Sequence, residues 1–284
     1  MEFILYIIYF SKQFVYNIYR QGGRIMTKII ASDLDGTLLL HGAQSLNPEI
    51  FDIILALKEK GIQFISASGR QIASQRKLFA PIADEISYIA ENGAVCFHHG
   101  NMIAAFEMER NLAFRILDCI DQFDDCKAVV SGIQACYVKS GDDNFFHHVA
   151  HVLNNTTEIV DDFREITEPI LKIAFWDLSR EYAHADYFKN KFNHEVKVIT
   201  SGSDWVDFMP YGTNKGSALR IMLEKLGIAP KDMIAFGDQE NDVEMLTLAG
   251  KSYAMEGGVP AAKEVADELT SCVEDTLKTL LTTL

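Results

Sequence analysis

Residues 29–38 constrain the fold of this chain more than any other segment. An apolar run leads directly to Asp33 and Asp35, and Gly36 and Thr37 follow. Near-continuous apolar runs are typical of parallel strands that are buried on both faces. The carboxyl end of such a strand would place two carboxylates side by side at the edge of a sheet. Negative charge crowded in this way is useful only with a hard cation, or with a phosphate and a cation.

Strand and helix patterns alternate from this point. Strands are predicted at residues 28–32, 62–67 and 86–90. A helix is predicted between each pair, and the first is marked by Asn47 as N-cap, Pro48 at its first position and Gly61 at its end. Its apolar residues recur at the i, i+3, i+4, i+7 spacing of an amphipathic helix. This βαβαβ order predicts an α/β fold with a doubly wound parallel sheet.

The pattern then changes and later returns. A hairpin is followed by short strands mixed with helices, which predicts an inserted α+β domain. Helices and strands alternate again from a helix at 215–226 to one that starts at Pro260. The predicted division is a Rossmann-like core of residues 26–94 and 210–284 with an α+β domain of residues 95–209 between them.

Residues 1–25 differ from the rest. The apolar run at 3–10 is too short to span a bilayer, and Glu2 precedes it where a signal peptide would carry positive charge. We interpret these residues as an N-terminal extension or as untranslated leader ahead of Met26, because the Gly-Gly-Arg codons at 22–24 can spell a ribosome-binding site. A membrane-surface anchor is the alternative, although no stable membrane association is expected. Mass spectrometry of the native N-terminus would distinguish these interpretations.

Charge and cysteine content narrow the function classes. The formal net charge of −14 argues against nucleic acid, whose phosphates need a basic surface. An acidic protein can still bind an anionic substrate when Mg²⁺ supplies local positive charge. The five cysteines are scattered and form no C-x-x-C pair, which predicts a reduced, cytoplasmic protein.

Four turns carry the residues whose side chains could take part in catalysis or binding. They contain Asp33 and Asp35, then Ser68 and Gly69, then Lys215, and last the run Gly-Asp-Gln-Glu-Asn-Asp at 237–242. Ligands of open α/β sheets bind beyond the carboxyl ends of the strands, where these turns should converge. Carboxylates, a hydroxyl, an ammonium and small glycines suit a magnesium ion and a phosphate.

The four motifs, in this order, resemble those of the haloacid-dehalogenase-like (HAD) superfamily of phosphohydrolases, and the layout resembles its Cof-like, type IIB sugar-phosphatase branch. The resemblance covers the chain from Thr27 to its end. It implies that Asp33 is the nucleophile, which forms an aspartyl-phosphate. It also implies that Asp35 is the general acid and base. Asp238 would bind Mg²⁺ together with Asp33 and the backbone carbonyl of Asp35.

The remaining roles also come from the resemblance. It implies that Ser68 and Lys215 bind phosphate, with backbone N–H groups near Leu34 and Gly69. Asn241 and Asp242 would position phosphate, water and Lys215.

Weaker candidates accompany these motifs. Arg70 is a candidate contact for a second phosphate or a hydroxyl, or else a surface residue at a helix start. Asn92 is a candidate substrate contact, or else part of a tight Asn-Gly turn. One departure from the family pattern lies at 256–260, which reads Glu-Gly-Gly-Val-Pro where the family often carries Gly-Asn-Ala. A substrate-side contact in that turn is therefore in doubt.

The resemblance implies a Mg²⁺-dependent phosphatase of a small phosphorylated metabolite, such as a sugar phosphate. The inserted domain would cover the site and recognise the leaving group. A phosphomutase with the same intermediate and a non-catalytic sugar-phosphate sensor are the alternatives, although a pure binder has no need for Asp35. The sequence leaves the oligomeric state open.

Overall fold

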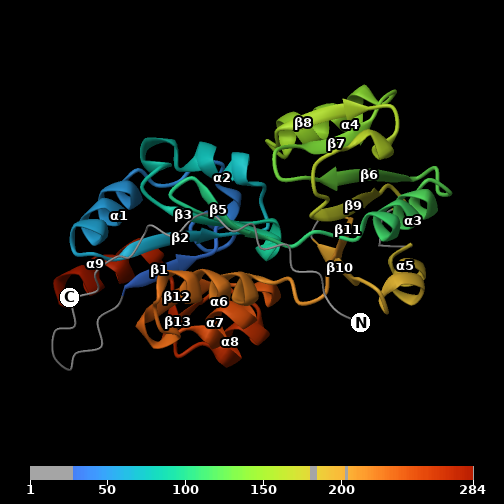
Figure 1. The fold of residues 1–284 in the computed structure, drawn as a ribbon. Helices are drawn as coiled ribbons and strands as arrows, with labels where there is room; N and C mark the ends of the chain where they lie inside the picture. The colour runs from blue at the N-terminus through green and yellow to red at the C-terminus, as the bar shows by residue number, and fades with distance from the viewer. Residues whose placement is uncertain (1–27, 180–183, 202–203, 284) are drawn as a thin grey trace.

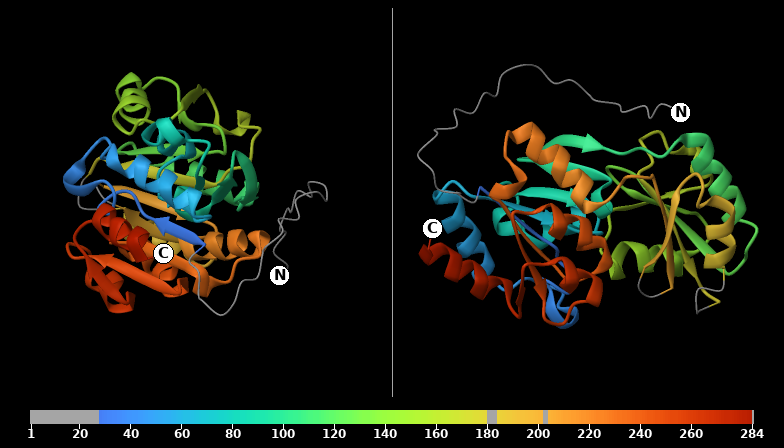
Figure 2. Two further views of the ribbon diagram at one scale, coloured as in Figure 1. Left: turned by 90° about the vertical axis from the view of Figure 1, so that its left-hand side faces the viewer. Right: turned by 90° about the horizontal axis from the view of Figure 1, so that it is seen from below.

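Two sheets organise the part of the chain that the computed structural model describes, which is residues 28–179, 184–201 and 204–283 (Figure 1). One sheet lies in each of two bodies that sit side by side, as the view from below also shows (Figure 2). The interpretation of residues 1–25 falls outside the described residues. Within the described ranges, no helix has both the length and the apolar character needed to cross a bilayer.

The first sheet is the predicted core. Its strand order is β14-β13-β12-β1-β2-β3-β4-β5, and the strands from β14 to β3 in this order run parallel. The strands are β1 (Ile29–Ser32), β2 (Gln63–Ala67), β3 (Ser87–Ala90), β4 (Val95–His98), β5 (Asn101–Ala105), β12 (Met233–Gly237), β13 (Lys251–Met255) and β14 (Glu268–Thr270). All residues of β1 are buried, as expected for a parallel strand with a helical layer on each face.

Helices cover both faces of this sheet (Figure 1). One layer contains α1 (Glu49–Glu59), α2 (Ile72–Leu78) and α9 (Val273–Thr283), and the other contains α6 (Lys215–Leu226), α7 (Val243–Leu248) and α8 (Pro260–Val265). Alternate residues of β1 supply the two cores: Ile30 packs in the first layer, and Ile29 and Ala31 pack in the second. The predicted doubly wound α/β fold is thereby confirmed.

Local signals set the ends of the helices. Asn47 was predicted as the N-cap of α1, but this helix begins at Glu49, and the Asn47 side chain accepts the Glu49 N–H at 3.2 Å. Asn47 thus makes the predicted capping contact, and Pro48 already has helical backbone angles, although the helix is assigned from the next residue. The side chain of Asn214 caps α6 through the N–H of Ser217, and Gly227 ends it with a left-handed φ of 66°.

The β4–β5 hairpin lies in the core sheet, although the sequence-based division placed residues 95–105 in the insert. β4 pairs antiparallel with β3, and β5 pairs antiparallel with β4. The short turn at Glu91–Gly93 reverses the chain beside β3, so the hairpin extends the sheet there. We therefore place the start of the insert after Ala105.

The insert (residues 106–209) is built around the second sheet. Its strand order is β10-β11-β9-β6-β7-β8, and all pairs except β7–β8 are antiparallel. The strands are β6 (Cys126–Ser131), β7 (Cys136–Lys139), β8 (Thr157–Val160), β9 (Lys172–Asp177), β10 (Lys197–Ser201) and β11 (Trp205–Met209). Its α-helices are α3 (Arg110–Ile120), α4 (Asp143–His147) and α5 (Ala185–Phe192). A π-helical turn (His148–Val152) follows α4 directly.

Candidate active site

The carboxyl ends of β1, β2 and β12 bring the four predicted turns to one edge of the core sheet. Asp33 follows β1, Ser68 follows β2, and Asp238 follows β12. Lys215 opens α6, whose side chains pack on the same part of the sheet. This convergence was the main expectation from the parallel alternation of strands and helices.

Lys215 is the centre of the cluster. Its side chain is fully buried, and Nζ donates to Asp33 Oδ1 at 2.5 Å and to Asp242 Oδ1 at 2.6 Å. Burial opposes the ammonium charge, but Asp242 and Asp33 outweigh it and raise the pKa of Lys215 above its usual value. The lysine therefore stays protonated and holds Asp33 in place.

Negative charge exceeds positive charge around this lysine. Asp33, Asp238 and Asp242 each offer a carboxylate oxygen, and these atoms lie within 4.8 Å of one another. Burial raises the pKa of Asp33 well above its usual value; Lys215 opposes the shift, while Asp242 and Asp238 add to it. Burial also raises the pKa of Asp238, and Asp242 adds to that shift. A bound cation would relieve this crowding, and a set of carboxylate oxygens is the donor set that hard cations take.

Asp242 has a supporting position in this cluster. Its Oδ2 accepts the N–H groups of Asp238 and Gln239 at 2.9 and 3.0 Å, while Lys215 takes Oδ1. Both Asp242 oxygens are thus held by Lys215 and by backbone N–H groups, whereas Asp238 Oδ2 accepts a hydrogen bond from the side chain of Gln239 at 3.1 Å. Thr37 donates its hydroxyl to Asp238 Oδ1 at 3.0 Å, a contact that the sequence did not predict although Thr37 belongs to the first motif.

Gly36 lets the first turn approach Asp238. Its φ is +89°, and a Cβ built on it would lie 2.2 Å from Asp238 Oδ2. This position has no room for a side chain, and its backbone conformation also favours glycine.

Gly36→Ala is expected to displace the Asp238 carboxylate. We expect a loss of activity of about 100-fold or more, with a higher Mg²⁺ requirement, because a displacement of about 1 Å near reacting groups has effects of this size. Gly42→Ala is the matched control, since Gly42 has a similar φ of +75° but open space around its Cβ position. Steady-state assays over a Mg²⁺ titration compare the two variants, and equal behaviour would contradict the crowding argument.

Asp35 lies apart from the buried cluster. Arg70 binds it with two hydrogen bonds, from Nε to Oδ2 at 2.8 Å and from Nη2 to Oδ1 at 2.6 Å. The Asp35 side chain is 55% exposed, so its carboxylate faces the open side of the site. Hydrogen bonding to Asp35 raises the pKa of Arg70. The sequence named both residues as candidates but did not predict that they pair.

The turn after β2 meets the turn after β3. Ser68 is buried, and its Oγ accepts the Arg70 N–H at 3.1 Å. A Cβ on Gly69 would lie 2.9 Å from Asn92 Oδ1, which accepts Asn241 Nδ2 at 3.0 Å. The structure thus brings Asn92 and Asn241, named as separate candidates, into direct contact.

Leu34 contributes to the core. Its side chain is fully buried among the apolar residues of the first helical layer. Only the backbone of Leu34 could therefore contact a ligand.

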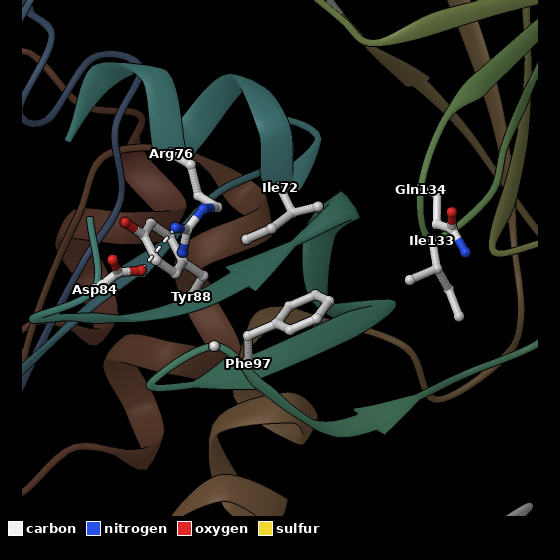
Figure 3. A pocket seen from close by; sticks show the side chains of 8 residues that line it. Ile72, Arg76, Asp84, Tyr88, Phe97, Ile133 and Gln134 are labelled. Carbon is white, nitrogen blue, oxygen red and sulfur yellow. Dashed lines mark hydrogen bonds and ion pairs between the residues drawn. The ribbon is translucent and has the colours of Figure 1, made fainter. Parts of the chain in front are cut away.

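A separate pocket of about 370 Å³ lies at the seam between core and insert (Figure 3). Ile72 and Phe97 line it from the core, and Ile133 and Gln134 line it from the insert. None of the predicted site residues lines this pocket, so it is distinct from the carboxylate cluster.

Comparison with known proteins shows the family and the fold. A family model described as haloacid dehalogenase-like hydrolase matches residues 30–276. The 5-amino-6-(5-phospho-D-ribitylamino)uracil phosphatase YbjI of Escherichia coli (strain K12) is 29% identical over 245 residues, which cover 84% of this chain and 89% of that protein. A crystal structure from Eubacterium rectale has a TM-score of 0.81 at 27% identity, and the match covers 90% of this chain and 100% of that chain. The HAD subclass IIB sugar phosphatase BT4131 shares the fold, with a TM-score of 0.74 at 18% identity over 89% of this chain and 99% of that chain.

Proposed function

Because the chain belongs to the haloacid dehalogenase-like hydrolase family, we propose that it is a Mg²⁺-dependent phosphatase of a small phosphorylated metabolite. The predicted family, fold class and enzyme class are confirmed by the family match and by a relative named as a phosphatase. The residue roles and the substrate are parts of the proposal.

The contact between Lys215 and Asp33 carries the proposal. A carboxylate is a poor nucleophile toward a phosphate dianion, because the two charges repel each other. The buried ammonium reduces that repulsion and holds one oxygen of Asp33, so that the other oxygen is oriented to attack phosphorus. As the bond from Asp33 to phosphorus forms, the bond from phosphorus to the leaving oxygen breaks. Asp35 must be protonated and released from Arg70 to donate a proton to that oxygen. It then takes a proton from the water that hydrolyses the aspartyl-phosphate.

A magnesium ion fits the same cluster. Asp33 and Asp238 would hold it, with the backbone carbonyl of Asp35 that the family resemblance implies. Bound Mg²⁺ would neutralise charge on the carboxylates and on the phosphate oxygens. Burial first, and the neighbouring carboxylates second, raise the pKa values of Asp33 and Asp238, and a bound cation would offset both effects.

The names of two similar proteins bear on the substrate class. One relative is named for a phosphorylated ribityl chain on a pyrimidine, and a structural neighbour is titled a sugar phosphatase. We propose a phosphorylated sugar or sugar alcohol as the substrate. A cytoplasmic location is part of this proposal and is supported by the free cysteines of the described residues.

Phosphate release tests the proposal. The full chain is incubated with a panel of sugar phosphates, sugar-alcohol phosphates and nucleotides, with Mg²⁺ or with EDTA. We expect free phosphate from at least one member, and no release with EDTA. Isomerised substrate without free phosphate, followed by phosphorus NMR, would indicate a mutase instead. Thermal stabilisation by the panel without either product would indicate a sensor.

A further inference from the structure

We propose that Lys172 of the insert is a positioning residue: it holds the turn Glu91–Gly93 from across the boundary between insert and core, and so fixes Asn92 beside the catalytic turns. The inference rests on the proposed function for its kinetic readout. Its structural readout is independent of that function.

The turn Glu91–Gly93 is strained. Three successive residues have positive φ, with 50° at Glu91, 55° at Asn92 and 101° at Gly93. Residues other than glycine rarely adopt this conformation, and it persists only where the surroundings enforce it. Two backbone hydrogen bonds join this turn to the turn after β2. The Glu91 N–H donates to Arg70 O at 3.2 Å, and the Asn92 N–H donates to Ser68 O at 3.1 Å.

The same turn touches three of the catalytic turns. Asn92 accepts the side-chain N–H of Asn241 and closely approaches Gly69. A Cβ on Gly93 would lie 2.3 Å from the carbonyl oxygen of Asn214, the residue that caps α6 ahead of Lys215. A small change in the conformation of this turn would therefore displace the residues proposed to bind phosphate.

The insert supplies the remaining contact. Lys172 Nζ lies 2.8 Å from Glu91 Oε2 and 3.5 Å from Asp207 Oδ1, and all three side chains are at least 86% buried. Burial disfavours the ammonium, but Asp207 and Glu91 outweigh it and hold the pKa of Lys172 above its usual value. An ion pair buried this deeply fixes its partners, because separating them would leave unpaired charge.

Next to this ion pair, the two bodies are also joined by apolar packing. Leu171 is fully buried against Ala90, Ala94 and Val95, which flank the strained turn. Ile133 of the insert and Phe97 of the core also pack against this apolar cluster, and both line the pocket of Figure 3. Other contacts cross the boundary elsewhere, such as the hydrogen bond from the Thr156 N–H to Gln71 Oε1 at 2.9 Å. Lys172 differs from these contacts because it pairs with the strained turn itself.

Lys172→Met tests the role directly. We expect kcat to fall about tenfold or more, while the Mg²⁺ concentration for half-maximal activity stays within about twofold, because misplaced positioning groups lower rates by factors of this order. Glu91→Gln, which keeps the size of the side chain, should also lower kcat. Lys127→Met is the matched control, because Lys127 pairs with Asp142 inside the insert. Its kcat should be unchanged.

The structural readout uses the side-chain amide of Asn92. Its NMR resonance is assigned by its loss in Asn92→Ala, and it should shift in Lys172→Met and Glu91→Gln but not in Lys127→Met. An unshifted resonance in both test variants, with unchanged kcat, would overturn the proposal. If the wild-type chain releases no phosphate from any substrate, the proposed function fails, and the amide shift alone decides whether Lys172 positions the turn. If Lys172→Met does not fold, the kcat and the Asn92 amide resonance of Glu91→Gln alone decide the proposal.

Discussion

Asp33→Asn is expected to abolish phosphate release, by at least about 10⁴-fold, because removal of a nucleophile leaves only the binding contribution to the rate. Asparagine has nearly the same size as aspartate, so the fold should be retained. It should also retain Mg²⁺-assisted phosphate binding, since Asp238 and Lys215 are unchanged. The measurement combines initial rates with the thermal stabilisation that phosphate and Mg²⁺ give to each protein.

Asp161→Asn is the control, because it makes the same chemical change at an exposed residue. Its activity should equal that of the wild type. Near-normal turnover in Asp33→Asn would overturn the assignment of the nucleophile. Loss of both turnover and phosphate-induced stabilisation would show that Asp33 acts mainly in binding.

Lys215→Met should lower both activity and stability. Removing the ammonium leaves two buried carboxylates without their cation, a change that costs about 3–5 kcal/mol in comparable buried pairs. Activity should fall about 10³-fold, since the charge that offsets the nucleophile and the phosphate is lost. Denaturant unfolding in EDTA measures the stability term, and assays in excess Mg²⁺ measure the rate.

The stability deficit of Lys215→Met should depend on pH in a defined direction. The pKa of Asp33 is already raised in the fold, and loss of Lys215 removes an influence that lowers it. A carboxyl group with a raised pKa stabilises the fold at low pH and loses that contribution as pH rises through its folded value. The deficit should therefore be smaller near pH 5 than near pH 8. Lys60→Met, at an exposed lysine, should show neither effect, and a pH-independent deficit would argue against the buried-charge explanation.

The carboxylate cluster could be predicted because its signals are local. Asp33 and Asp238 each follow a short apolar strand, and Lys215 follows a helix cap. Parallel strands place their carboxyl ends at one edge, so the convergence of these residues follows from the order of elements alone. No long-range information was needed.

Other features depend on pairings that a local pattern does not specify. The alternation in residues 95–105 predicts a hairpin, but it does not say which sheet the hairpin joins. The strained turn at Glu91–Gly93 decides this by directing β4 back along β3. The pairs Arg70–Asp35 and Lys172–Glu91 likewise join residues from different elements. A lysine at the start of an apolar strand was the one available signal for the second pair.

Two elements near the C-terminus were not predicted, for different reasons. β14 is only three residues long, and two of these are exposed, so it carries almost no apolar pattern. α9 does carry one, since Val273 and Leu277 are four residues apart and pack beneath α1. Its periodicity could have been recognised from the sequence.

The placement of β1 between β2 and β12 has a consequence for biosynthesis. Ile30 pairs with Phe64 on one side and with Ile234 on the other, so one edge of the aspartate-bearing strand stays uncovered until most of the chain has left the ribosome. The strands of the insert, by contrast, are continuous in the chain, and domains fold as units during translation. The insert can complete its sheet first. The nascent protein then completes its carboxylate cluster only when Lys215, Asp238 and Asp242 emerge, so a chain that ends before Asp242 lacks part of the proposed catalytic set.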